Sequence, residues 1–201
     1  MKKIEEPKNI KFEEAVKRHN GTDEDLHLLA QSEGDSFIDK TAKKLVAFGA
    51  MQRNAFPVLV NYDLPHNLQI EEVGFDWITD YDGNLILKNP TEHLYPLPVG
   101  RKKQRITLVP IDCPAKKEAV LARMEELNVR PTLSPEFLAL TRAFPDLQRQ
   151  FPLIGLGSVW AGSGGNRLVL YACESSGERD LRLRWDDREW DVDFRFPAVC
   201  L

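Results

Sequence analysis

Apolar residues alternate with charges of both signs through the C-terminal part of the chain, residues 164–201. Because side chains of a β-strand point alternately to opposite faces, this alternation predicts strands with one core face and one displayed face. We expect them over residues 167–172, 179–185 and 194–200. In the second strand, Leu181, Leu183 and Trp185 occupy the expected core face. The displayed face carries Asp180, Arg182, Arg184 and Asp186.

The first 55 residues have a different, helical pattern. Apolar residues recur at helical spacing in residues 12–18, 22–29 and 36–48, and Gly49 can end the last helix. From residue 56 the chain changes to short β-type runs at residues 57–60, 69–73, 77–79 and 85–87. The Asp82-Gly83 pair between the last two runs favours a hairpin. We therefore predict an N-terminal helical segment over residues 1–55 and a second domain over residues 56–201.

Strands and helices are mixed in the middle of the chain. Residues 105–111 are typical of a strand, and Pro114 and Pro135 each favour a helix start because proline is tolerated in the first turn. A strand over residues 151–156 follows. The glycines at 155–157 are interpreted as a turn, because a dinucleotide-binding motif would lead into a helix. This order of elements predicts an α+β fold.

Composition limits the classes of partner. The 201 residues are 42% hydrophobic with a formal net charge of −4, which favours a folded domain and argues against nucleic-acid binding. No apolar run approaches the roughly 20 residues of a membrane helix, and no secretory pattern is present. We expect no membrane insertion and, by default, a cytoplasmic location. Cys113, Cys173 and Cys200 lack metal-ligand spacing and are expected to be free thiols.

Motifs for catalysis or metal binding fail on their spacing. Residues 78–89 lack the terminal glutamate of a calcium loop, and residues 162–164 lack the spacing of a nucleophile elbow. The histidines are scattered, without the spacing of zinc ligands. They are His19, His27, His66 and His93. We therefore expect no catalytic residues, no metal site and no cofactor, and a protein that is not an enzyme.

An ordered series of residues resembles the variable (target) proteins of diversity-generating retroelements from archaea and small-genome bacteria. It begins with residues 106–110, continues through two helices and residues 144–152 to residues 157–160, and extends over about residues 100–201. The further framework residues of the series are Arg167, Val169, Tyr171, Gly177, Arg179, Leu181, Leu183, Trp185, Trp190, Arg195, Phe196, Ala198 and Val199.

The resemblance implies a C-type lectin-like fold. In such a fold the first and last strands pair, two helices follow the first strand, and a small antiparallel sheet displays a variable region, here about residues 157–201. In the family that the chain resembles, an error-prone reverse transcriptase replaces template adenines, chiefly in asparagine codons. The ligand-binding, variable positions carried over are Asn166, Leu168, Cys173, Ser175, Ser176, Asp180, Arg182, Arg184, Asp186, Asp187, Arg188, Asp191, Asp193 and Phe194.

This chain departs from the family pattern in two places. Such codon changes do not reach glutamate, so Glu174, Glu178 and Glu189 are either fixed or mark a copy that has drifted. Family members commonly end in a basic pair, whereas this sequence has Pro197 and ends in Cys200-Leu201.

The function that the resemblance implies is ligand binding by a hypervariable surface. We expect a monomer whose macromolecular ligand, a protein or a glycan, is not identified by the sequence. One alternative is a catalytic domain like the formylglycine-generating enzymes, which share the lectin-like fold and need paired reactive cysteines or a metal; Cys173 and Cys200 would then have to lie close together. Another is a structural adaptor acting through the N-terminal helices. An ordinary solvated sheet face would also account for the charges.

Overall fold

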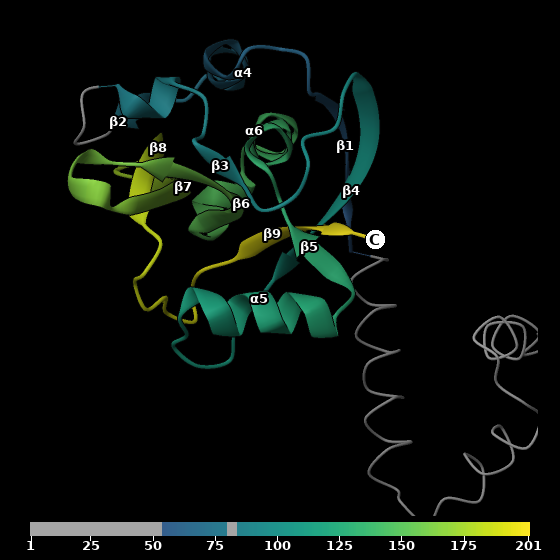
Figure 1. Ribbon diagram of the computed structural model, residues 1–201, viewed down its shortest axis with the longest axis vertical. Helices are drawn as coiled ribbons and strands as arrows, with labels where there is room; N and C mark the ends of the chain where they lie inside the picture. Colours follow the sequence, from purple (N-terminus) through teal and green to yellow (C-terminus); the bar gives the residue numbers. More distant parts are fainter. Residues whose placement is uncertain (1–53, 80–83) are drawn as a thin grey trace, which may run out of the picture. The chain divides into compact units, whose positions relative to one another are not determined.

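The computed structural model describes residues 54–79 and 84–201. They form an α+β structure with two β-sheets, which confirms the predicted fold class (Figure 1). The predicted helical segment, residues 1–55, lies outside the described residues except for its last two, and the Asp82-Gly83 pair also lies outside them. Within the described ranges, no helix is both long enough and apolar enough to cross a membrane.

The first sheet is antiparallel, with the strand order β1-β4-β9-β5. Its strands are β1 (Phe56–Asn61), β4 (Arg101–Val109), β9 (Phe196–Cys200) and β5 (Val129–Pro131). β9, the last strand of the chain, pairs with the second half of β4, where Ile106 lies opposite Val199. This pairing brings together the two ends of residues 101–200.

The second sheet has the order β2-β8-β7-β6-β3. β6 (Leu153–Ala161), β7 (Arg167–Ser175) and β8 (Glu178–Trp185) form its antiparallel centre. β3 (Glu92–His93) and β2 (Trp77–Thr79) are the short edge strands, and β2 runs parallel to β8. The β7–β8 turn is tight because Ser176 and Gly177 both adopt positive φ angles, 56° and 88°.

Four α-helices and two 3₁₀ turns complete the described chain: α4 (His66–Val73), α5 (Lys117–Glu126), α6 (Ser134–Ala143), α7 (Leu147–Gln150), η1 (Leu85–Leu87) and η2 (Ser163–Gly165). α6 begins where the sequence predicts, and a Glu136 carboxylate oxygen accepts a hydrogen bond from the Leu133 backbone N–H at 2.8 Å. α5 begins beyond Pro114, because Ala115 exchanges two backbone hydrogen bonds with Trp190 instead.

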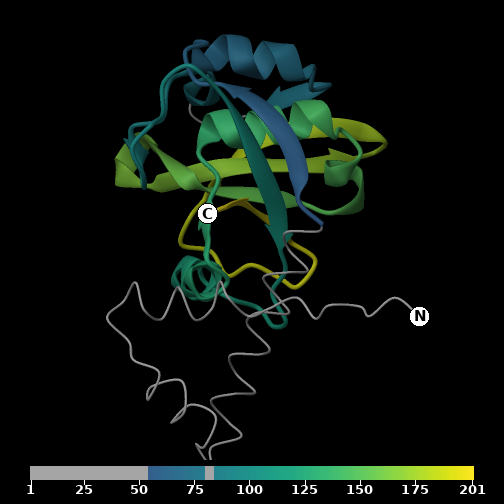
Figure 2. The same cartoon turned by 90° about the vertical axis from the view of Figure 1, so that its right-hand side faces the viewer.

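Two apolar clusters lie on opposite faces of the β6-β7-β8 sheet. The first contains Leu168 and Leu170 and includes side chains of α4 and α6. The second contains Val169 and Trp190 and includes side chains of α5. Figure 2 shows α4 and α6 on one side of this sheet and α5 on the other. Residues 168–170 are therefore consecutively apolar because both faces of β7 are buried here.

Three local predictions are wrong. Residues 69–73 belong to α4, in which Gln69, Ile70 and Val73 are buried at helical spacing; so short an apolar run does not distinguish a helix from a strand. Residues 85–87 form η1, and β2 pairs with β8, so these two runs do not form a hairpin. Residues 155–157 lie inside β6. A Cβ at Gly157 would lie 2.4 Å from the Thr132 carbonyl oxygen, so this glycine permits a close backbone approach.

Candidate functional site

The strand β8 presents two chemically different faces. Leu181 and Leu183 belong to the first apolar cluster. The residues that alternate with them, Asp180, Arg182 and Arg184, therefore lie on the opposite face of the strand. There the Arg184 guanidinium lies 4.9 Å from the centroid of the Tyr171 ring, and this ring lies 6.1 Å from that of Phe194. We call this set the outer face; it comprises Tyr171, Cys173, Asp180, Arg182, Arg184 and Phe194.

Polar contacts fix one end of the outer face. Asp180 is buried and accepts a hydrogen bond from the Arg182 guanidinium, which raises the pKa of Arg182. Gln148 of α7 donates hydrogen bonds to the carbonyl oxygens of Cys173 and Asp180, at 2.7 and 3.4 Å. Arg182 Nε is a buried donor without a partner among the described residues. The outer face is therefore a rigid support that still has an unused hydrogen-bond donor.

An open depression of about 530 Å³ lies where β8 ends and η2 leads into β7. Its lining consists of Gly165, Asn166, Arg167, Trp185, Asp186 and Asp187. Trp185 is 57% exposed, and Asn166 and Asp187 are exposed as well. We call this the Trp185 depression. An exposed tryptophan ringed by polar groups is typical of surfaces that bind other molecules.

Ion pairs fix the polar wall of the Trp185 depression. Asp186 is buried, and its Oδ2 lies 2.5 Å from Lys117 Nζ and 3.3 Å from Arg167 Nε. The Arg167 guanidinium also reaches Glu92 Oε2 of β3 at 2.8 Å, and this hydrogen bond lowers the pKa of Glu92. Lys117 of α5, Glu92 of β3, Arg167 at the start of β7 and Asp186 just after β8 are thus connected by ion pairs. The exposed side chains beside them therefore lie on a support that is already ordered before a ligand binds.

A buried arginine attaches β8 to the helices. Arg179 donates hydrogen bonds from Nη2 to the Thr141 carbonyl oxygen (2.9 Å) and from Nε to Gln148 Oε1 (3.3 Å). Its Nη1 donates to the carbonyl oxygens of Val73 and Gly74, at 3.3 and 3.4 Å. These carbonyl groups lie at the C-terminal ends of α6 and α4, where backbone oxygens lack partners within the helix. Arg179 is therefore part of the scaffold, although it stands within a run of surface charges.

The structure distributes the fourteen predicted ligand-binding residues over three environments. Seven are exposed: Asn166, Ser175, Ser176, Asp187, Arg188, Asp191 and Asp193. Three are half-buried: Arg182, Arg184 and Phe194. Four are buried: Leu168, Cys173, Asp180 and Asp186. Leu168 packs in the first apolar cluster, and Asp180 and Asp186 hold arginine or lysine side chains. These four are not displayed in this structure, so the candidate surface consists of the other ten.

Trp185 itself is not buried, contrary to the prediction. It follows Leu183 on the same face of β8, but it is the last residue of the strand and is 57% exposed. Strand alternation identifies the face on which a side chain lies, but it does not tell how far along the strand the covering layer extends. Trp185 therefore changes from a buried framework residue into an exposed aromatic side chain that lies beside Asn166 and Asp187 of the candidate surface.

Cys173 and Cys200 are separated in the structure, whereas His66 and His93 line the same cavity; His19 and His27 lie outside the described residues. All three cysteines are free thiols; Cys173 lies in β7 and Cys200 in β9, and these strands belong to different sheets. Burial raises the pKa of both thiols, whereas a reactive thiolate has a lowered pKa. Among residues 54–79 and 84–201, no group of three or more potential ligands is placed to hold a metal ion.

Sequence reasoning missed Lys117, Glu92 and the pairing role of Arg167 because these residues are distant in sequence and meet only through the sheet. Lys117 stands on α5 before the buried Val120, a position that could have suggested burial.

Comparisons with protein-family models, with curated proteins and with solved structures find no match for this chain.

Proposed function

We propose that residues 56–201 form a C-type lectin-like scaffold that displays a hypervariable, ligand-binding surface diversified by a retroelement. Three features of the fold support this proposal. β4 pairs with the last strand β9, the helices α5 and α6 follow β4, and β6, β7 and β8 form an antiparallel sheet. The resemblance of the sequence to retroelement target proteins implies the same three features.

The observation that carries the proposal is the Trp185 depression. Two of the exposed predicted variable residues, Asn166 and Asp187, line it beside Trp185. Aromatic side chains contribute large binding energies when a partner covers them, and neighbouring polar residues then decide which partner fits. The ion pairs of Asp186 fix the polar wall of the depression. A substitution at Asn166 or Asp187 therefore changes the contacts available to a ligand while the sheet stays folded.

The ligand class that fits this surface is a macromolecule, a protein or a glycan. The Trp185 depression is open to solvent, and the exposed positions Arg188, Asp191 and Asp193 extend the polar surface along the loop after β8. Such an area offers many directional contacts around one aromatic anchor, as antibody binding loops do. The proposed activity is binding without chemical conversion of the ligand.

Selection from two matched libraries tests the binding role. The first library keeps Trp185 and randomises Asn166, Asp187, Arg188, Asp191 and Asp193; the control library randomises five exposed positions at or near α5, which are Lys116, Glu118, Arg123, Glu125 and Glu126. Both are displayed in the full chain and selected against a test protein such as lysozyme. We expect binders to be enriched from the first library and not from the control. Equal enrichment from both, or none from the first, would contradict the proposed binding surface.

A further inference from the structure

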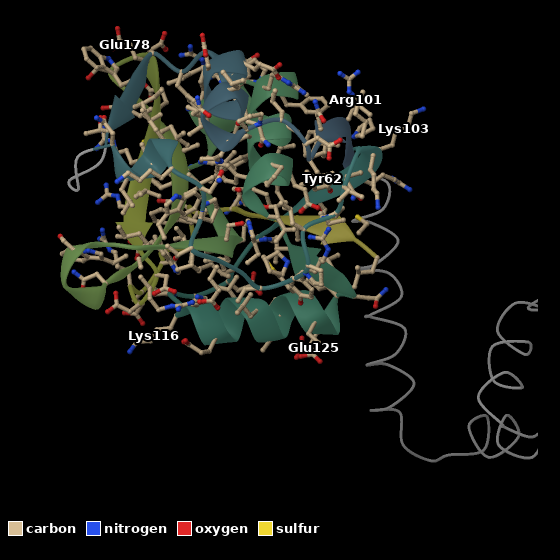
Figure 3. All side chains as sticks on the ribbon, turned by 45° about the horizontal axis from the view of Figure 1, so that its top comes forward. Tyr62, Arg101, Lys103, Lys116, Glu125 and Glu178 are labelled. Atoms are coloured by element: carbon tan, nitrogen blue, oxygen red, sulfur yellow. The ribbon has the colours of Figure 1, made fainter. Side chains whose placement is uncertain are left out.

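The strands β1 and β4 of the first sheet present a face that remains exposed. Val58 and Val60 are buried in the first apolar cluster, so the residues that alternate with them lie on the opposite face. There, Leu59 of β1 lies opposite Lys103 of β4, and it is 52% exposed. We call this exposed set the basic face; it comprises Pro57, Leu59, Arg101, Lys103 and Arg105. Figure 3 shows Arg101 and Lys103 pointing outward from the domain, with Tyr62 inward of them.

The same side of the sheet is covered farther along β4. Thr107 and Val109 continue the alternation of the basic face, and both are buried. Val109 belongs to the second apolar cluster, which includes Val120 and Met124 of α5. The helix α5 therefore covers one half of this side of the sheet and leaves the basic face open.

The positive charges at the start of β4 are not balanced within the described chain. Arg101, Lys102 and Lys103 form no ion pair with a described carboxylate. Elsewhere ion pairs are common, and they include Arg123, Arg130, Arg142, Arg149, Arg167 and Arg182. The whole sequence has a net charge of −4, so this excess of positive charge is local. Such a patch attracts an anionic partner.

The free edge of β1 is partly occupied by side chains. β1 is the first strand in the order β1-β4-β9-β5. Arg142 Nη2 donates to the Leu59 carbonyl oxygen at 3.4 Å, and Gln69 Nε2 donates to the Asn61 carbonyl oxygen at 3.5 Å. A partner that added a strand here would displace both side chains. We therefore expect a partner to contact the side chains of the basic face instead.

The geometry of the basic face favours an acidic peptide. Residues two apart along a strand are separated by about 6.5–6.8 Å, so Arg101 and Lys103 match carboxylates at alternate positions of a second extended chain. Leu59, beside Lys103, offers an apolar contact to the same peptide. Single-stranded nucleic acid binds through stacked aromatic side chains as well as charge. Phe56, the only aromatic residue of β1 and β4, instead packs against Phe144, with ring centroids 5.0 Å apart.

We propose that the basic face binds an extended acidic peptide segment of another protein. Carboxylates at alternate positions of this segment pair with Arg101 and Lys103, and an apolar side chain of the segment covers Leu59. The basic face belongs to the first sheet, whereas the Trp185 depression lies at β7 and β8 of the second, so this inference does not depend on the proposed function.

NMR of the full-length, nitrogen-15-labelled protein tests the proposal. The probe is a synthetic peptide with aspartates at alternate positions, serines between them and a leucine at one end. Its uncharged match has asparagine in place of each aspartate. We expect saturable amide shifts in β1 and the first half of β4 with the aspartate peptide and none with the asparagine peptide. Raising the salt concentration from about 0.05 to about 0.5 M should weaken the binding, because exposed ion pairs are screened.

Two double variants separate the basic face from charge in general. Arg101→Gln with Lys103→Gln removes the two proposed contacts and is expected to lower the affinity about tenfold. Lys116→Gln with Arg188→Gln is the matched control, because it removes two exposed charges outside β1 and β4, and it is expected to leave the affinity unchanged.

Three results would overturn the proposal. The first is the absence of amide shifts in β1 and β4 with the aspartate peptide, and the second is an equal loss of affinity in the two double variants. The third concerns nucleic acid. If an oligothymidylate bound more tightly than the aspartate peptide and were weakened by the Arg101→Gln and Lys103→Gln pair, the basic face would be a nucleic-acid surface instead.

Discussion

Replacement of Arg179 by methionine removes the connection between β8 and the helices while keeping most of the aliphatic volume. The guanidinium group is buried, 5.1 Å from the Phe75 ring centroid, and it donates to three backbone carbonyl oxygens and to Gln148. None of the described carboxylates lies within ion-pair distance of it, and burial lowers the pKa of Arg179. The arginine therefore stabilises the fold through hydrogen bonds to helix ends rather than through an ion pair.

The magnitude follows from two opposing contributions. A hydrogen bond to a charged group contributes about 1.5–3 kcal/mol, and each acceptor left buried without a donor costs about 1–3 kcal/mol. Against this, the variant no longer buries a charge, which offsets part of the loss. Of the four contacts only that to Thr141 is short, at 2.9 Å. We therefore expect Arg179→Met to lower the free energy of unfolding by about 3 kcal/mol.

Urea denaturation followed by circular dichroism measures this change. Arg188→Met is the matched control, because Arg188 is exposed on the loop after β8, and it is expected to change the free energy of unfolding by less than about 0.5 kcal/mol. Arg179→Lys should fall between the two, since one ammonium group cannot replace the planar guanidinium fork. If Arg179→Met were as stable as Arg188→Met, the role assigned to Arg179 in the scaffold would be refuted.

Three further predictions concern stability. Trp190→Ala should cost about 3–5 kcal/mol of unfolding free energy and the exposed Trp185→Ala less than about 1 kcal/mol, as measured by urea denaturation; equal losses would contradict the assigned burial. Gly157→Ala should lower the melting temperature, because its Cβ meets the Thr132 carbonyl oxygen at 2.4 Å; an unchanged melt would contradict this close approach. The folded-state pKa of His66, about 4, lies below the ordinary 6.5, so the unfolded chain takes up the proton first as pH falls. Stability from the neutral ring is complete above pH 6.5, and about 3 kcal/mol of it should be lost between pH 6.5 and 4. His66→Phe should lack this part of the pH dependence in denaturation series, and identical pH profiles would refute it.

Elements with strong local signals were predictable from the sequence. The start of α6 follows from the proline after Ser134, and β7 and β8 follow from the apolar alternation along residues 167–172 and 179–185. Residues 69–73 and 85–87 were not predictable, because runs of three to five residues suit either a helix or a strand. Their conformation is decided by the tertiary contacts that cover them.

The candidate site was predictable only in part. The alternation along β8 correctly separated the buried Leu181 and Leu183 from Arg182 and Arg184, which lie on the opposite face of the strand. It did not show that Asp180 and Asp186 are buried. Arg182, the partner of Asp180, stands only two residues away on the same strand, but Lys117, the partner of Asp186, comes from α5 and is brought close only by the fold. The cavity lined by His66 and His93 had no sequence signal at all, since three separate segments, residues 62–69, 89–97 and 134–135, meet to form it.

Sequencing of the genomic surroundings of the coding gene tests the central claim most directly. The account predicts an adenine-rich, imperfect copy of the region that encodes about residues 157–201, beside a reverse-transcriptase gene. The copy should differ from the gene in the codons of displayed residues such as Asn166, Asp187 and Arg188, and it should agree in the codons of the buried residues Leu183 and Trp190. Absence of such a copy, together with identical sequences among sister genes at the displayed positions, would contradict the account.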